Sequence, residues 1–336
     1  MKILVTGSSG FVGEALVQAL AAAGCSGVAV SRRVQSGLPS RWRWVDRDKC
    51  LLGEVLQVET PDWVIHLEVK HHVAEPGPAD LAEFEAVNCA GTQRWLDWCT
   101  SRGVKRFLYF SSIKAVAESP EILNESASQV PTTPYGQSKR EAEVKVQAWA
   151  RAQSQRCALV IRPAVIYGPR GAGNIHSMIR ALDRGTFLLP GRGENVKSLV
   201  SIHNVVAAVT HLIGRMERGF EIYNVVDEQN YSVAEIAHMI STRLGRARNV
   251  RRIPLSLARM AAAIGGVVQR VTGKQSPITP SRLRALCETT HFSARKLCET
   301  GFRHPQSTAD GLAETVAWYR ESARDTRAVT TDQKRK

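Results

Sequence analysis

Three side chains that could move a proton stand close together near the middle of the sequence. Ser111 and Ser112 follow a short apolar run, and Tyr135 and Lys139 come next, four residues apart. On a helix, Tyr135 and Lys139 would lie on one face. A lysine ammonium beside the phenol, whose pKa is ordinarily about 10, would favour the phenolate. The set therefore predicts general acid–base catalysis, although a Tyr-x-x-x-Lys pair alone also arises by chance.

The elements that would position these residues can be read from hydrophobic periodicity. Residues 107–110 are apolar throughout, which is typical of a central parallel strand ending at Ser111. Pro134 precedes Tyr135, and an amphipathic helix is predicted to continue from 141 to 153. Further strands are predicted at 28–30, 42–45, 63–67, 159–163 and 222–225, with helices over 79–102 and, after the capping box at Ser232, through 244.

A second candidate site lies at the N-terminus. Residues 3–5 form a short apolar run, glycines follow at 7, 10 and 13, and apolar residues then recur at helical spacing. A strand, a Gly-rich turn and a helix N-terminus together bind a pyrophosphate, although a purely structural turn is the alternative. The pattern predicts dinucleotide binding by Gly7, Ser9, Gly10, Phe11, Val12 and Gly13.

The end of the second predicted strand bears on which dinucleotide binds. NAD-binding units usually place a carboxylate there to bond the ribose hydroxyls. This chain has Ser31, Arg32 and Arg33 instead. A small hydroxyl and cations would accept a 2′-phosphate, so NADP is predicted over NAD, unless the arginines are merely solvated.

Composition narrows the class of protein. The chain has 336 residues, of which 43% are hydrophobic, so it can form a large domain and a smaller one. Its seven cysteines are odd in number and form no Cys-x-x-Cys pair, which predicts reduced thiols and no metal site. His71 and His72 lack partners at ligand-like spacing. A first strand at Lys2 and the absence of a long apolar run predict a cytoplasmic protein without a membrane span.

The formal net charge is +14, and basic residues cluster in 243–252 and 320–336. No aromatic residues interleave these clusters, so nucleic acid is not the predicted partner. Attraction of a phosphorylated substrate and cofactor accounts for part of the charge. The apolar, Ala-rich segment 253–271 is predicted to be a packed helix, with a helix on a lipid surface or a hydrophobic substrate as the alternative.

The Gly-x-x-Gly-x-x-Gly spacing followed by Ser112, Tyr135 and Lys139 resembles the extended short-chain dehydrogenase/reductase family, in its NAD-dependent epimerase/dehydratase branch. Residues 111–118 resemble a segment of bacterial nucleotide-sugar epimerases, with Val116 and Ala117 replacing Asn and Gly. Residues 273–319 resemble the 3β-hydroxysteroid dehydrogenase branch. The resemblance covers roughly residues 2 to 320.

This resemblance implies roles for individual residues. Ser112, rather than Ser111, would hold the substrate oxygen near Tyr135. Asn88 matches an Asn-x-x-Gly-Thr helix, where a buried structural role is at least as good an interpretation as a catalytic one. Glu68 and Val69 replace two small residues of the family. Further implied contacts are Asp46, Leu67, Tyr135, Lys139 and Pro163 with the cofactor, and Asn174 and Lys197 with the substrate.

The implied fold is α/β, a Rossmann doubly wound parallel sheet with a smaller C-terminal α/β substrate lobe. Residues 1–169 would form the NAD(P)-binding domain, with 197–226 returning to it. Residues 170–196 and 227–320 would form the lobe, and 321–336 a disordered basic tail.

The implied activity is that of a UDP-sugar 4-epimerase in surface polysaccharide synthesis, acting on a nucleotide sugar, with a homodimer as one possible assembly. Two alternatives remain open at this point. One is an NADP-dependent reductase or dehydrogenase of a hydrophobic alcohol or ketone. The other is a non-catalytic cofactor-sensing or RNA-binding relative, against which the intact Ser112, Tyr135 and Lys139 argue.

Overall fold

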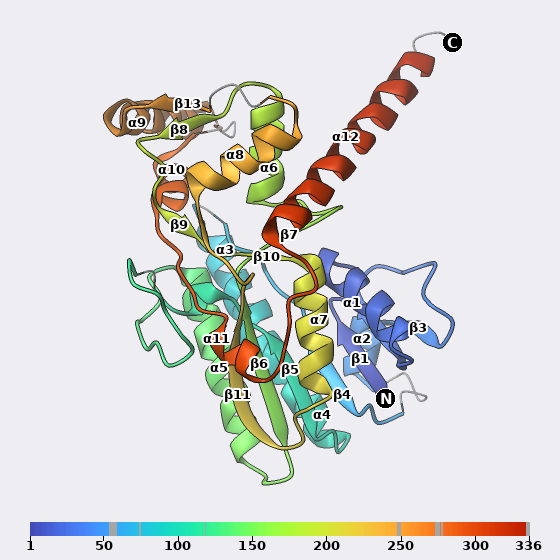
Figure 1. Cartoon of the computed structure of the whole chain (residues 1–336). Coiled ribbons are helices and arrows are strands. Elements are labelled where there is room, and N and C mark those ends of the chain that lie inside the picture. The colour runs from blue at the N-terminus through green and yellow to red at the C-terminus, as the bar shows by residue number, and fades with distance from the viewer. Residues whose placement is uncertain are drawn as a thin grey trace.

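The computed structural model describes residues 1–53, 59–73, 75–117, 119–246, 250–272, 276 and 278–333, with side chains as far as 323. A seven-stranded sheet forms its centre, with the strand order β11-β6-β5-β4-β1-β2-β3 (Figure 1). Every pair of neighbouring strands in this sheet is parallel. The strands are β1 (Lys2–Thr6), β2 (Ser26–Ser31), β3 (Trp42–Asp46), β4 (Trp63–His66), β5 (Arg106–Phe110), β6 (Cys157–Pro163) and β11 (Gly219–Val225).

The strand order reverses direction between β1 and β4, which is the doubly wound arrangement expected from the sequence. In such a sheet the crevice beyond the carboxyl ends of the strands at this reversal is the usual ligand site. The Gly-rich turn follows β1, and Leu67 follows β4, so both lie at this crevice.

Helices cover both faces of the sheet. On one face α1 (Phe11–Ala22) packs beside α7 (Ile202–Ile213), and on the other α4 (Ala90–Ser101) packs beside α5 (Pro134–Arg151). Each face has its own buried apolar core, one containing Leu16 and Val205 and the other Trp95 and Val146. A strand run such as 107–110 is buried on both sides, which explains its continuous apolar character.

The predicted helix over 79–102 is helical along its length but not uniform. It consists of α3 (Pro78–Glu83), a π-helical segment (Phe84–Cys89) and α4. The wider π-turn shifts the helix face between α3 and α4, and periodicity alone did not reveal it.

The remaining elements form a lobe over the carboxyl ends of the strands (Figure 1). Three small two-stranded sheets pair β7 with β10, β9 with β12 and β8 with β13. The elements are β7 (Val165–Tyr167), α6 (Asn174–Asp183), β8 (Leu188–Pro190), β9 (Val196–Lys197), β10 (Leu199–Ser201), β12 (Tyr231–Ser232), α8 (Val233–Arg243), β13 (Arg251–Ile253), α9 (Leu255–Thr272), α10 (Pro280–Cys287) and α12 (Thr308–Gln333). Helix α11 (Arg295–Glu299) packs on β11 of the main sheet, and α2 (Arg47–Leu51) follows β3. The division of the chain into domains at 169, 197 and 227 stays a prediction.

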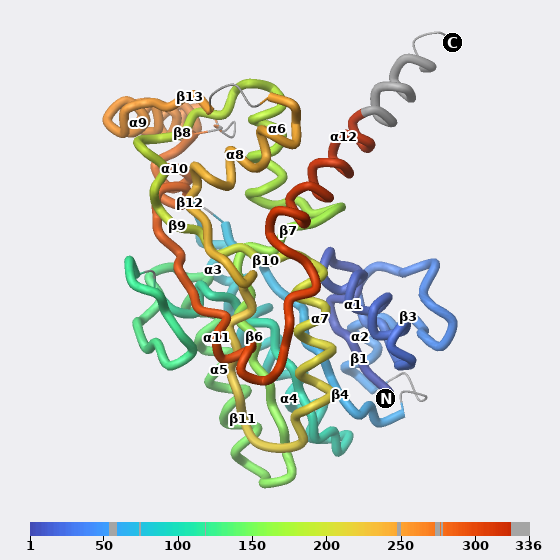
Figure 2. The backbone as a smooth tube through the Cα atoms, viewed as in Figure 1, coloured from blue at the N-terminus to red at the C-terminus, as the bar shows by residue number. Residues whose placement is uncertain are grey.

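The end of the chain differs from the expectation. Helix α12 contacts β7 and α8 and then runs away from the sheet (Figure 2). Its bounds extend to Gln333, whereas a disordered tail was predicted from 321, and that disorder stays a prediction. Residues 308–333 contain no proline and only one glycine, so nothing in the sequence ends the helix earlier. Among the described residues, no helix is both long and apolar enough to cross a bilayer.

Candidate active site

The Gly-rich turn between β1 and α1 is shaped to hold a diphosphate. Gly7 has φ of +64°, a conformation that favours glycine. A Cβ at Gly13 would lie 2.4 Å from the carbonyl oxygen of Gly7, so only glycine lets α1 approach the turn this closely. Gly10 precedes α1 and gives it no side-chain cap. The first N–H groups of α1 are therefore available to an anion, and the residues present fit a dinucleotide.

Neighbouring segments fix the shape of the turn. Ser8 Oγ donates to the carbonyl oxygen of Val30 at 3.0 Å, which ties the turn to the end of β2. A Cβ at Gly7 would lie 2.9 Å from the carbonyl carbon of Leu67, so the segment after β4 lies directly against the turn. The Phe11 ring reaches Gly168 and Gly171. Ser9, Phe11 and Val12 are each half-buried around the turn.

The end of β2 does not present a free hydroxyl. Ser31 is buried, donates from Oγ to the carbonyl oxygen of Arg33 at 2.7 Å, and accepts from Trp44 Nε1 at 3.0 Å. Arg32 is exposed. Asp46 caps α2 by accepting from the amides of Asp48 and Lys49. The hydroxyl that the sequence assigned to a 2′-phosphate is thus already used within the protein.

Glu68, which departs from the family pattern, lies near this end of the site. Its carboxylate accepts from Trp95 Nε1 at 2.9 Å. Burial raises the pKa of Glu68, while the Trp95 hydrogen bond and the nearby charges of Arg47 and Arg32 lower it. Arg32 therefore has an acidic neighbour, which reduces its value as a phosphate ligand.

Buried polar residues support the segment after β4. His66 is fully buried between Thr6, whose Oγ1 lies 2.7 Å from Nδ1, and Thr92. Burial, with Lys139 nearby, lowers the pKa of His66 to about 3, so the ring is neutral. Asn88 bonds both backbone groups of Lys70, at 2.8 and 3.2 Å, and donates to Ser138 Oγ. Asn88 therefore has the structural role that the sequence left open.

The structure brings Ser112, Tyr135 and Lys139 together where β5 ends and α5 begins. Thr133 caps α5 by accepting from the Gly136 amide, and Pro134 occupies its first turn. The Ser112 hydroxyl lies close enough to the Tyr135 phenol to lower its pKa. The Lys139 side chain passes under the site, and its Nζ donates to the carbonyl oxygen of Phe110 at 2.7 Å. The Tyr135 ring packs edge-on against His72 and Phe84.

Burial dominates the proton equilibria of this set. It raises the pKa of Tyr135 to about 12, against which the Ser112 hydrogen bond acts in the opposite direction. Burial also lowers the pKa of Lys139 to about 7, while the carboxylate of Glu143 raises it. The lysine charge is therefore close to its titration point near neutral pH, which the sequence did not indicate.

A buried ion pair beneath the site was missed from the sequence. Arg162 and Glu143 form two hydrogen bonds, at 2.8 and 2.6 Å, and Ser111 Oγ donates to Glu143 at 2.5 Å. All three side chains are buried. Two signals were available: Arg162 interrupts an apolar strand, and Glu143 stands four residues after Lys139 on the same helix face.

The predicted substrate residues lie on the lobe. Asn174 is exposed at the start of α6. Lys197 lies on β9, and its Nζ donates to the carbonyl oxygen of Ala285 in α10 at 2.8 Å. Glu288, just after α10, pairs with Lys114 at 3.7 Å, two residues from Ser112. A chain of contacts thus joins Lys197 to the catalytic set, whereas no such contact is described for Asn174.

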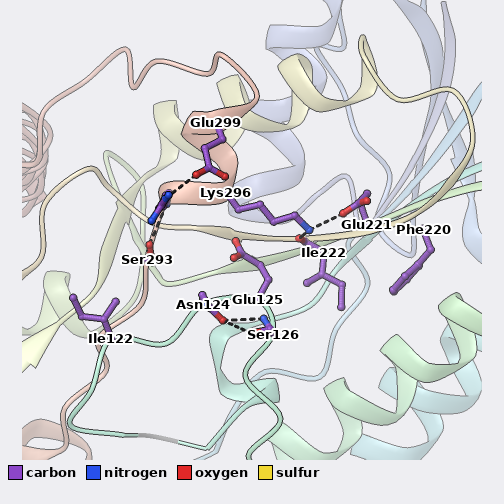
Figure 3. A pocket seen from close by; sticks show the side chains of 11 residues that line it. Ile122, Asn124, Glu125, Ser126, Phe220, Glu221, Ile222, Ser293, Lys296 and Glu299 are labelled. Atoms are coloured by element: carbon purple, nitrogen blue, oxygen red, sulfur yellow. Dashed lines mark hydrogen bonds and ion pairs between the residues drawn. The ribbon is translucent and has the colours of Figure 1, made fainter.

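Two other features lie apart from these residues. An open hollow of about 710 Å³ beside β11 is lined by Glu125, Glu221 and Lys296 among others, and it includes no predicted site residue (Figure 3). Glu85, Cys89 and Glu141 have ligand atoms within 4.8 Å of one another. Burial and the two carboxylates raise the pKa of the Cys89 thiol well above its usual range, so it stays protonated and donates to Glu141.

Comparisons with known proteins agree with this geometry. UDP-glucose 4-epimerase of Vibrio cholerae is 30% identical over 334 residues, 94% of each chain. N-acetyl-alpha-D-glucosaminyl-diphospho-ditrans,octacis-undecaprenol 4-epimerase of Escherichia coli O157:H7 is 27% identical over 94% of this chain and 95% of the relative. The solved structure of MoeE5 with UDP-glucuronic acid and NAD superposes with a TM-score of 0.75 at 25% identity, over 96% of this chain and 100% of that one.

A model of the NAD dependent epimerase/dehydratase family matches residues 3–225, from the first strand to the last strand of the main sheet. This stretch includes the Gly-rich turn and the segment from Ser112 to Lys139. Because the match covers more than half of the sequence, and a relative 30% identical spans nearly all of it, the chain belongs to the NAD-dependent epimerase/dehydratase family.

Proposed function

We propose that the protein is an NAD-dependent 4-epimerase of a UDP-sugar, with Ser112, Tyr135 and Lys139 as its catalytic set. The observation that carries the proposal is the placement of Ser112, just after β5, beside Tyr135 in the first turn of α5, which Lys139 joins to β5 through the Phe110 carbonyl. It places two groups that can bind and protonate one substrate oxygen next to the crevice where the Gly-rich turn lies. The similarity to UDP-glucose 4-epimerase supports the sugar class.

The residues divide the work as follows. Ser112 Oγ would hold the sugar C4 oxygen, and Tyr135 Oη, as the phenolate, would take the proton from the C4 hydroxyl and later return it. Because burial favours the protonated phenol, the phenolate would depend on nearby positive charge and on the Ser112 hydroxyl. NAD, held by the Gly-rich turn, would supply a reversible hydride acceptor, so that no net oxidation results. Lys139, anchored on the Phe110 carbonyl, contributes positive charge under the site when protonated. Epimerisation also requires that the sugar turn its other face before the hydride returns.

NAD is proposed as the cofactor in place of the NADP that Ser31 and Arg32 suggested. The Ser31 hydroxyl already bonds Arg33 and Trp44, and Arg32 lies near the acidic Glu68. A 2′-phosphate would therefore depend on the exposed Arg32 and Arg33. NAD is also the dinucleotide in the MoeE5 structure.

The relatives suggest two substrates. A UDP-sugar is the first, and Lys197 would meet its diphosphate, with Asn174 as a further contact. A sugar joined through a diphosphate to a polyprenol is the second candidate, because the relative of E. coli O157:H7 is named for that substrate. The Val116 and Ala117 substitutions lie beside Ser112 and are compatible with a changed sugar pocket. The reductase of a hydrophobic alcohol or ketone is not favoured, since the two relatives described above, which align with 94% of the chain, are 4-epimerases.

The test is an epimerase assay with UDP-glucose and UDP-N-acetylglucosamine, in which the 4-epimer is separated by chromatography after incubation with NAD. Tyr135→Phe is expected to lower the rate by about 100-fold or more while nucleotide binding and Tm are retained. The matched control is Tyr223→Phe. Tyr223 lies on β11, where its ring packs under the Lys296 ammonium, and the variant should keep full activity. Wild-type activity in Tyr135→Phe, or NADPH oxidation by a ketone with no epimer formed, would contradict the proposal.

A further inference from the structure

Helix α9 carries its large apolar residues on the side that faces solvent. Leu257, Met260, Ile264, Val267, Val268 and Val271 are between 48% and 80% exposed. At 3.6 residues per turn these six positions fall within an arc of about 100°. They form one continuous stripe along the helix, which we call the α9 stripe. A helix on an ordinary protein surface would show polar residues on this side.

The packed side of α9 consists of small residues. Ala258, Ala262 and Gly265 are buried against the rest of the lobe. A Cβ at Gly265 would lie 2.1 Å from the carbonyl oxygen of Ile278, so the fit requires glycine. Because the small face is fitted this closely, the orientation of the helix is set, and the exposure of the α9 stripe follows from it.

The stretch of sequence that carries α9 has charges of one sign. Residues 236–287 contain no aspartate or glutamate. The same stretch has ten positive residues. Eight of them are exposed in the structure, namely Arg243, Arg246, Arg251, Arg252, Arg259, Arg270, Arg282 and Arg284, and the other two, Arg248 and Lys274, lie outside the described residues. An apolar stripe on a helix whose own charged residues are both arginines, Arg259 and Arg270, is the pattern of a helix that lies in a membrane interface. One carboxylate from another segment, Glu75, contacts α9 through Gln269.

The position of α9 is also suited to a surface contact. It lies at the end of the lobe that is farthest from the main sheet, together with β8 and β13 (Figure 1). It packs on α10, whose Ala285 carbonyl accepts from Lys197. At its other end Gln269 Nε2 donates to Glu75, three residues after His72, which packs on Tyr135. The neighbours of α9 therefore belong to segments that also carry candidate site residues.

We propose that the α9 stripe docks the protein on the surface of an anionic lipid bilayer. The six aliphatic side chains would enter the boundary between headgroups and acyl chains, and the arginines of this segment would meet the lipid phosphates. The inference goes beyond the proposed function, since docking needs neither the cofactor nor the catalytic set. A sugar attached to a polyprenyl diphosphate, the second candidate substrate, would be presented at such a surface.

The experiment is co-sedimentation of the full chain with phosphatidylcholine vesicles that contain about a quarter phosphatidylglycerol. We expect Leu257→Gln/Ile264→Gln/Val268→Gln to lower the partition coefficient by about tenfold or more, because three aliphatic anchors are lost. Arg259→Gln/Arg270→Gln should weaken binding to these vesicles, and salt should weaken wild-type binding. The matched control is Leu52→Gln/Val130→Gln, which replaces exposed aliphatic residues outside the lobe and should bind like the wild type.

Epimerase activity on a free UDP-sugar separates the two proposals. The triple α9 variant should keep this activity within about twofold, which also shows that it folds. Normal epimerisation without vesicle binding by the wild type would overturn the docking inference and leave the proposed function intact. Vesicle binding without epimerisation would contradict the proposed function and leave the docking inference intact. Light scattering tests whether the α9 stripe instead joins two copies of the chain. In that case the triple variant would have a lower molecular mass in solution than the wild type, and the wild type would not bind vesicles. This result would overturn docking.

Discussion

Lys139 Nζ lies 2.7 Å from the carbonyl oxygen of Phe110, the last residue of β5. This contact fixes the start of α5 against the strand that delivers Ser112. The same Nζ stands 4.8 Å from the centre of the Tyr109 ring. One buried lysine therefore links the two elements whose ends must meet for Ser112 to reach Tyr135.

The burial of Lys139 makes stability depend on pH in a defined direction. Its pKa falls from 10.5 to about 7 on folding, so between these values the unfolded chain holds the extra proton. The contribution of this group to the unfolding free energy therefore rises with pH over that range, by at most about 1.4 kcal/mol per pH unit. Relative to the wild type, Lys139→Met should be most stable near pH 6.5, and its advantage should shrink by about pH 9.5. Urea denaturation at several pH values measures this difference.

Lys105→Met serves as the control for this experiment, because Lys105 is exposed at the opposite end of β5. Its stability difference from the wild type should stay constant across the same pH range. A difference for Lys139→Met that grew with pH would show that the lysine is not buried as described.

Gly13→Ala tests the close approach of α1 to the Gly-rich turn. The new Cβ would lie 2.4 Å from the Gly7 carbonyl oxygen and 2.7 Å from Ser8 Cα, so α1 or the turn must move. We expect a loss of about 1–3 kcal/mol in unfolding free energy and a fall of about tenfold or more in NAD affinity. Gly214→Ala, where the nearest atom would lie 3.6 Å away, should change neither quantity measurably. Calorimetry and thermal denaturation give both quantities, and equal NAD affinity in the two variants would contradict the role of the turn.

Glu143→Gln tests the ion pair beneath the catalytic set. The substitution leaves the buried Arg162 guanidinium without a carboxylate, which should destabilise the protein by about 3–5 kcal/mol. The double variant Glu143→Gln/Arg162→Met should recover part of this loss, because no unpaired charge remains. Glu141→Gln, on the exposed side of the same helix, should have little effect. The single variant Arg162→Met completes the comparison. If the double variant lost as much unfolding free energy as the two single variants together, the pair would have no coupling energy.

The sequence was sufficient where the signal is local. The strand, turn and helix around Gly7 to Gly13 were readable because glycine spacing and apolar periodicity are properties of neighbouring residues. The place of Tyr135 and Lys139 one turn apart on the same helix followed from their spacing. That Lys139 Nζ bonds the Phe110 carbonyl did not follow from it, and the action of the ammonium on the Tyr135 phenol stays a prediction. Asn88 and Asn174 show the limit of analogy: the first received a structural role only from its contacts with Lys70 and Ser138, and the second stays a prediction.

Tertiary structure decided the features that depend on which distant segments meet. Ser31 lost its assigned role because Trp44, from the adjacent strand, occupies its hydroxyl. The pKa of Lys139 shifts because α5 and β5 exclude water from Nζ, and no sequence pattern states that exclusion. For α9 the sequence did not decide between a packed helix and a helix on a lipid surface, since the same residues are compatible with both. Only the close fit of Gly265 against Ile278 determined which side is buried, and hence that the large aliphatic residues face outward.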